Sequence, residues 1–264
     1  MKATGSLGPK AFVAVVRELR TSADDRPIVV AGAPALASVL ARELRAGGDA
    51  SAVAEGGSTT RGAVLVYVLA AAPAPDDLDA LRRADREEVP VVCLTRPDVD
   101  EVPYVLATDL VAVEPGASFP LEEIASAVAG KLGERGGGLA RRLPVLRRAV
   151  CDELIRRYAR KNGLVGAAVF VPGVDMPVLT LNQIRLVLRI AQAYGHELDR
   201  ERVLEILPVV AGGLGLRTLA RELLDLVPVA GWLLKGAVAY AGTRAVGEAA
   251  VRYFEAGGPA ALKP

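Results

Sequence analysis

The first residues that suggest chemistry lie where a glycine ends a short apolar run. Residues 28–44 read IVVAGAPALASVLAREL, which predicts a buried strand, a tight turn at Gly32 and a helix. Turns of this kind bind phosphate in many α/β proteins, because backbone N–H groups and the positive end of the helix face the anion. The first question is therefore whether this turn can hold a nucleotide.

A phosphate-binding loop needs more than the first glycine. Its pattern, GxxxxGK[ST], supplies a second glycine, a lysine for the outer phosphates and a hydroxyl for magnesium. Counted from Gly32, these positions are Ala37, Ser38 and Val39, and Pro34 removes one backbone donor. We therefore expect no hydrolysis of nucleoside triphosphates and no catalytic residue at this turn.

A dinucleotide site is the alternative at the same turn. Its GxGxxG or GxGxxA pattern would place Gly32, Pro34 and Ala37 at the three key positions, and Glu55 ends the next apolar run where a ribose-binding acid would stand. The ring of Pro34, however, occupies the place where the pyrophosphate approaches the backbone. We favour an ordinary packing turn without a cofactor and keep dinucleotide binding through Gly32 and Glu55 as the alternative.

A second candidate site is an arginine-rich helix predicted from Leu139 to Asn162. Its apolar stripe faces a core, while the basic residues lie off that stripe. Six of them are candidate interaction residues: Arg141, Arg142, Arg147, Arg148, Arg156 and Arg157. A solvated helix face is the first interpretation, and binding to an anionic lipid surface or an acidic partner is the alternative. The total of 32 basic against 31 acidic residues argues against nucleic acid as the partner.

Other catalytic and metal-binding patterns are missing from the sequence. His196 is the only histidine, and Cys93 and Cys151 are far apart, so no zinc-type spacing occurs. No GxSxG nucleophile motif occurs either. Both cysteines lie in apolar runs, as buried thiols of a reducing cytosol do. With no recognisable export signal, we expect a cytoplasmic protein without a metal site.

Alternating strand and helix patterns occupy the first half of the chain. Apolar runs at 28–32, 50–55, 63–70, 89–95 and 109–114 predict strands, and amphipathic stretches at 35–46, 76–87 and 121–132 predict helices. Another helix is expected at about 10–21. This order predicts an α/β fold with a doubly wound, mostly parallel sheet.

The second half is predicted to be an all-α bundle. The glycines of GERGGG (133–138) suggest a linker, which divides the chain into domains 1–135 and 136–264. Thr180 and Gln183 form a predicted capping box, and Gly195 is a predicted helix stop. Further helices are expected at 199–211, 214–226 and 228–255. In the last one, a stripe of small residues (Ala237, Ala241, Ala245 and Ala249) predicts tight helix contacts within the chain or in a homo-oligomer through residues 237–249.

The apolar stretches of the bundle do not satisfy the requirements of a membrane span. The window 226–241 has 16 residues and includes Lys235, whereas a span needs about 20 apolar residues. A soluble bundle, or one that lies on the inner face of the cytoplasmic membrane, is therefore expected.

The first half resembles a degenerate G domain of the Era-like GTPases. In that family a guanine-specifying NKxD motif follows a strand, and here Thr95, Arg96, Pro97 and Asp98 stand in its place, so that only the acid remains. The stretch 54–62 lacks the DxxG motif of the family, and 111–132 is similar to its last strand, loop and helix. The resemblance implies a pseudo-GTPase with Asp98 as a remnant of guanine binding.

Residues 176–258 resemble the YcjF-like helical domain of unknown function. The likeness rests on Gln183, the Ala193–Gly195 corner, Asp199, the Gly212–Gly213 turn and the segment YAGTRAVGEAAVRYFE. The resemblance implies a bacterial protein of a type that follows Era-like domains and is often membrane-associated. No activity is implied by this domain. We therefore expect a non-catalytic scaffold or regulator with a protein partner such as an active GTPase, and residual GTP or GDP binding is the alternative.

Overall fold

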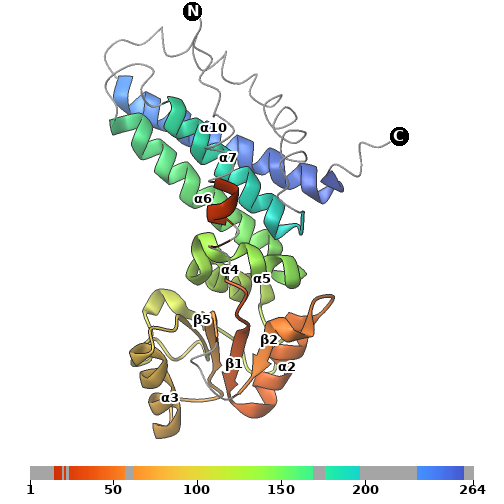
Figure 1. Ribbon diagram of the computed structural model, residues 1–264. Coiled ribbons are helices and arrows are strands. Elements are labelled where there is room, and N and C mark those ends of the chain that lie inside the picture. Colours follow the sequence, from red (N-terminus) through yellow and green to blue (C-terminus); the bar gives the residue numbers. More distant parts are fainter. Residues whose placement is uncertain are drawn as a thin grey trace, which may run out of the picture. The chain divides into compact units, whose positions relative to one another are not determined.

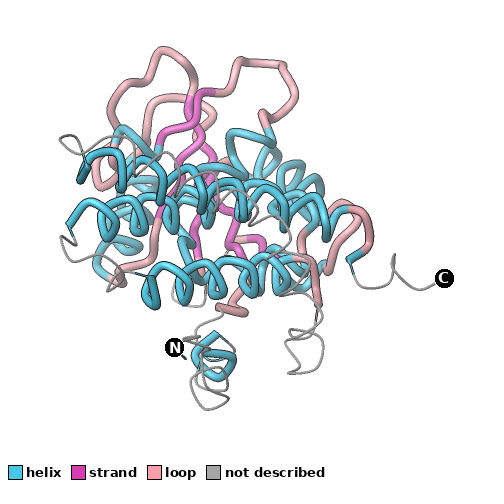
Figure 2. The backbone as a smooth tube through the Cα atoms, turned by 90° about the horizontal axis from the view of Figure 1, so that it is seen from above, coloured by secondary structure: helices cyan, strands magenta, loops and turns pink. Residues whose placement is uncertain are grey.

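The computed structural model describes residues 15–19, 21, 24–56, 62–168, 176–196 and 231–258. Most of this backbone is helical, and strands form a small part of it (Figures 1 and 2). The chain divides into two compact units. One is Ala23–Val150, and the other combines Met1–Ser22 with Cys151–Pro264. The predicted domain boundary after residue 135 lies inside the first unit and stays a prediction.

Five parallel strands form the sheet of the first unit. They are β1 (Ile28–Gly32), β2 (Val53–Glu55), β3 (Val64–Val68), β4 (Val91–Thr95) and β5 (Leu110–Ala112). Their spatial order is β2-β1-β3-β4-β5, and all neighbours pair in parallel. This is the flavodoxin-like doubly wound order, in which the direction of winding across the sheet reverses between β1 and β3. The predicted parallel α/β fold is confirmed.

Helices cover both faces of this sheet. α3 (Pro75–Arg86) packs through Leu81 and Ala84 on the face that carries Leu65, Tyr67 and Cys93. The remaining two helices, α2 (Pro34–Arg45) and α4 (Leu121–Leu132), contact the strands from the opposite face. A helix that follows β1 and one that follows β3 must lie on opposite faces, because right-handed crossovers run in opposite directions there. All three helices agree with the predicted ranges.

The glycine-rich segment 133–138 is not the linker that we predicted. It forms a 3₁₀ turn, η4 (Gly133–Arg135), and the start of α5 (Gly137–Arg142), and its glycines are buried. A Cβ at Gly138 would lie 2.6 Å from a carboxylate oxygen of Asp25, and one at Gly136 would lie 3.2 Å from the Val150 methyls. These glycines therefore permit close packing of this segment.

The predicted helix 139–162 is in fact two helices. α5 ends at Arg142, Leu143 is extended with φ −121° and ψ 97°, and α6 runs from Pro144 to Ala168. Proline lacks the N–H that would continue α5, and it drives the preceding residue out of the helical region. The boundary between the compact units falls inside α6.

α7 (Met176–Ala193) begins before the predicted capping box, because Thr180 already lies in the helix. Its predicted stop is confirmed. Gly195 has φ +81°, its N–H donates to the carbonyl of Gln192 (2.9 Å), and the N–H of His196 donates to the carbonyl of Ala191 (3.0 Å). This is the Schellman arrangement that a C-terminal glycine allows.

The last helix, α10 (Gly231–Glu255), ends where we predicted. Residues 15–19 are helical, in agreement with the helix expected at 10–21. The helices predicted at 199–211 and 214–226 lie outside the described residues. Within the described parts of the chain, no helix is both long enough and apolar enough to span a membrane.

In the helical unit, α7 and α10 run parallel and α6 runs antiparallel to both. The hydroxyl of Tyr194 bonds Glu255 at 3.0 Å, whereas Gly163 lies against Gly236. Among the described residues, the predicted alanine stripe is not the face of α10 in close contact with α6, because Ala237, Ala241 and Ala249 are exposed. The neighbouring face of α10 makes this contact, and a Cβ at Gly236 would lie 3.0 Å from the carbonyl oxygen of Gly163. Self-association through 237–249 stays a prediction.

Candidate functional site

The turn after β1 is closed by the neighbouring strand. Gly32 has φ +101°, and a Cβ there would lie 2.1 Å from the carbonyl oxygen of Val68 on β3. The same carbonyl accepts the N–H of Ala33 at 2.8 Å. Pro34 begins α2 and has no N–H, so this residue offers no amide to an anion. Glycine at this position is explained by backbone geometry alone.

Glu55 lies at the end of β2, next to the Gly32 turn, as the strand pattern predicts. Its carboxylate is held by two side chains of α2. Arg45 Nη1 lies 2.6 Å from Oε1, and the hydroxyl of Ser38 donates to Oε2 at 2.8 Å. The hydrogen bond from Arg45, followed by that from Ser38, lowers the pKa of Glu55. The acid expected to bind a ribose therefore joins α2 to β2.

Asp98 lies in the loop after β4 and is exposed. Its carboxylate accepts a hydrogen bond from Nε of Arg96 at 2.9 Å. Both residues belong to the Thr95–Asp98 segment that replaces the guanine-specifying motif. Asp98 follows β4, and β3 lies between β4 and the strand β1 that ends at Gly32. Glu55 and Gly32, in contrast, end the adjacent strands β2 and β1. The structure thus brings together Gly32 and Glu55 only.

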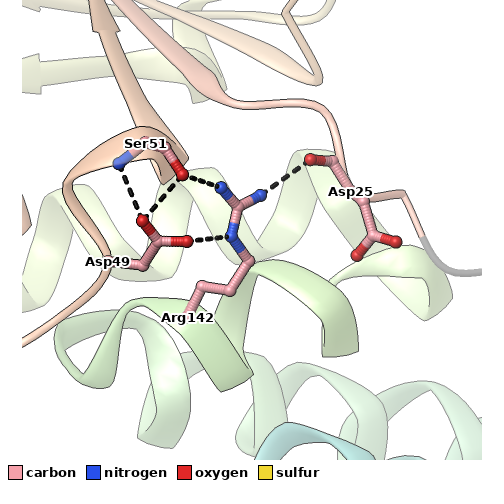
Figure 3. Close-up of polar contacts among 4 residues, drawn as sticks. All are labelled: Asp25, Asp49, Ser51 and Arg142. Carbon is pink, nitrogen blue, oxygen red and sulfur yellow. Dashed lines mark hydrogen bonds and ion pairs between the residues drawn. The ribbon is translucent and has the colours of Figure 1, made fainter.

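A second polar cluster lies at the opposite, amino-terminal edge of the sheet and is centred on Arg142 of α5 (Figure 3). Its guanidinium bonds Asp49 Oδ2 (2.9 Å), the Ser51 hydroxyl (2.9 Å) and the carbonyl oxygen of Asp25 (2.8 Å). Asp25 precedes β1, and Asp49 and Ser51 precede β2. We call these four residues the Arg142 clamp.

Asp49 is the acidic centre of the clamp. The hydroxyl of Ser51 donates to Asp49 Oδ1 at 2.7 Å and the N–H of Ser51 donates to it at 2.8 Å. These bonds, together with the one from Arg142, lower the pKa of Asp49 to about 2. Asp49 caps the short helix η1 (Ala50–Ala52) and pairs with Arg142 at the same time. The clamp therefore holds the segments that precede β1 and β2 against α5.

The six candidate arginines differ in exposure and in their hydrogen-bond partners. Arg141 is exposed at the end of α5, beside the clamped Arg142. Arg147 is half-buried and Arg148 is exposed, near the start of α6. Arg156 and Arg157 both bond the buried carboxylate of Glu153, which neutralises part of their charge. The pairings thus support structural roles for Arg142, Arg156 and Arg157.

Sequence reasoning missed the partners of these residues. Arg45, Ser38 and Asp25 carry no motif that would indicate their contacts. Only Asp49 and Ser51 gave a local signal, since an Asp two residues before a Ser is typical of a side-chain-capped turn.

Comparison with known proteins places one part of the chain in a family. Residues 134–261 match the model of a domain of unknown function, DUF697. No GTPase family matches the first half. Neither the curated proteins nor the solved structures gave a match to this chain. The helical landmarks and the family match agree, and residues 134–261 therefore form a YcjF-like DUF697 domain.

Proposed function

We propose that this protein is a non-catalytic scaffold or regulator in which a pseudo-GTPase-like α/β domain is combined with the DUF697 domain. It acts by binding another protein, such as an active GTPase, in the cytoplasm or at the inner face of the cytoplasmic membrane. The observation that carries the proposal is the state of the nucleotide-type turn. The N–H of Ala33 in this turn bonds the carbonyl of Val68 on β3, and the nearby acid, Glu55, bonds two side chains of α2.

Four contacts support this proposal over nucleotide chemistry. Ala33 gives its N–H to Val68, Glu55 is held by Arg45 and Ser38, and Asp98 is held by Arg96. A nucleotide would have to break these contacts before it could use the same groups. The turn also lacks the lysine and hydroxyl that hold a triphosphate and its magnesium ion.

Isothermal titration calorimetry of the full chain with GTP, GDP and ATP, each with Mg²⁺, tests the proposal. We expect no saturable heat up to millimolar nucleotide and no release of phosphate. Binding in the micromolar range together with Mg²⁺-dependent turnover would overturn it.

The second candidate function is dinucleotide binding, and one observation favours it. Glu55 and the Gly32 turn lie at the carboxyl ends of adjacent strands, close to the point where the strand order reverses. Doubly wound proteins bind ligands at that position. In this alternative, a ribose hydroxyl would compete with Ser38 and Arg45 for the carboxylate of Glu55.

Titration with NAD⁺ separates the two candidates. Glu55→Gln removes the charge, while Asp98→Asn serves as the control because Asp98 follows β4, farther along the sheet. Saturable NAD⁺ binding that is lost in Glu55→Gln and kept in Asp98→Asn would favour the dinucleotide function. If the protein is a scaffold, the unmodified protein should show no saturable binding of NAD⁺.

A further inference from the structure

A chain of side-chain hydrogen bonds passes through the interior of the helical unit. Asn182 on α7 donates to the amide oxygen of Asn162 on α6 at 2.7 Å. Asn162 in turn donates to the hydroxyl oxygen of Thr243 on α10 at 2.9 Å, and that hydroxyl donates to the carbonyl oxygen of Ala239 at 2.7 Å. All three side chains are buried. We call Asn162, Asn182 and Thr243 the amide layer.

The amide layer fits one alignment of the helices. Each donor in it meets an acceptor on another helix or one turn earlier on α10, so its direction is fixed from Asn182 to Ala239. A shift of one helix by a turn would leave these buried amide groups without partners. Unpaired polar groups in a low-dielectric interior are strongly disfavoured.

Small residues line the helix contacts next to the amide layer. Gly163 and Gly166 of α6 lie against α10, where a Cβ at Gly166 would come within 2.9 Å of the Ala239 side chain. On α10, a Cβ at Gly247 would come within 2.5 Å of Ile155. Small residues bring helices close together, but they offer few protruding side chains that interlock along the axis. At these glycine contacts, apolar packing therefore fixes the alignment only weakly.

α10 also carries two faces of small residues. One face, with Gly236, Thr243 and Gly247, is buried against α6 and α7. The other is the alanine stripe of residues 237–249, which is largely exposed. Both faces would allow close helix approach, and a buried hydroxyl partner for Asn162 exists on only one of them.

We propose that the amide layer is a register lock. It selects the face of α10 that packs inward, aligns α10 and α7 against α6, and keeps α10 from pairing with a second copy of the chain through its alanine stripe. Buried polar groups can fix helix register in this way while contributing little net stability.

The only histidine of the chain gives a direct reporter of this register. The His196 ring follows α7 and lies 4.9 Å from the ring of Phe254 near the end of α10. Ring-current shifts make its proton NMR signals depend on how α7 and α10 are aligned. The test compares Thr243→Val, which keeps the shape and loses the hydroxyl, with Thr243→Ser, which keeps the hydroxyl. A third variant combines Asn162→Leu, Asn182→Leu and Thr243→Val.

The register lock predicts one set of His196 signals in the unmodified protein and in Thr243→Ser. Thr243→Val and the triple variant are expected to show a second set with at least about a tenth of the intensity, or a doubled mass by light scattering. A single unchanged set with unchanged mass in both variants would overturn the proposal. Unfolding of the triple variant, with one set of signals in Thr243→Val, would assign the layer to stability alone and overturn it too.

Discussion

Replacement of Arg142 by Met tests whether the clamp holds the α/β unit together. Methionine keeps much of the apolar stem of Arg142 and removes its guanidinium group. The Arg142 side chain is 17% exposed. The variant loses the bonds to the Asp25 carbonyl and the Ser51 hydroxyl, and also the ion pair with Asp49. Asp49 is about half exposed, so its ion pair contributes little. The two other bonds lead us to expect a loss of about 2 kcal/mol in the free energy of unfolding.

Urea unfolding provides the measurement, with hydrogen exchange of peptides from β1 to β3 to identify the α/β unit. Arg141→Met is the matched control, because it removes the same charge from the exposed neighbouring position and should cost less than about 0.5 kcal/mol. Arg142→Lys should lie between the two, since one ammonium group cannot reproduce the planar fork of arginine. Equal stability of Arg142→Met and Arg141→Met would refute the reasoning.

The pH dependence of the clamp follows from Asp49. Its pKa is lowered to about 2 in the folded protein, so its ionised form favours the folded state at pH values above its ordinary pKa near 4. This contribution is lost as the pH falls from about 4 to about 2. In Arg142→Met the Ser51 bonds remain but the cation is gone, so the pKa of Asp49 is lowered less, and the loss of unfolding free energy between about pH 4 and about pH 2 should be smaller than in the unmodified protein. An identical acid-unfolding profile for the two proteins would contradict this role for Asp49.

Three further predictions concern the sheet. Gly32→Ala should lower the free energy of unfolding by more than about 2 kcal/mol in urea titrations, because Gly32 has positive φ and a Cβ there would clash with the backbone of Val68. Gly47 also has positive φ but has open space for a Cβ, so Gly47→Ala should cost about 1 kcal/mol. Tyr67→Phe should cost about 1 kcal/mol in the same assay, because the buried hydroxyl no longer donates to Asp77. Burial raises the pKa of Cys93 to about 12, so a thiol reagent should label it only after unfolding, and rapid labelling of the native protein would contradict the burial.

Local patterns in the sequence were sufficient for the elements of the sheet. The strands are continuous apolar runs, and α2 and α3 start at prolines that favour a first helical turn. Pro144 carried an equally local signal, and the periodic leucines around it concealed the break. The start of α7 was misjudged because Thr180 and Gln183 match a capping box whether or not the helix begins there.

The side-chain partners could not be predicted in the same way. The strand pattern predicts Glu55 as the acid next to the Gly32 turn, but its contacts with Arg45 and Ser38 arise only once α2 folds onto β2. On α10 the sequence offers two faces of small residues, and composition does not say which one is buried. Thr243 decides this through its bond with Asn162, a residue 81 positions away along the chain.

The Arg142 clamp also bears on how the DUF697 domain is attached. The family match begins at residue 134, yet α5 and the beginning of α6 belong to the compact unit Ala23–Val150. Arg142 therefore anchors the first helix of the domain to the amino-terminal edge of the sheet, while Gly32 and Glu55 lie at the carboxyl edge. An attachment at the amino-terminal edge leaves the carboxyl edge independent of the clamp. In the proposed scaffold, substitutions at the carboxyl edge would therefore leave this anchor undisturbed.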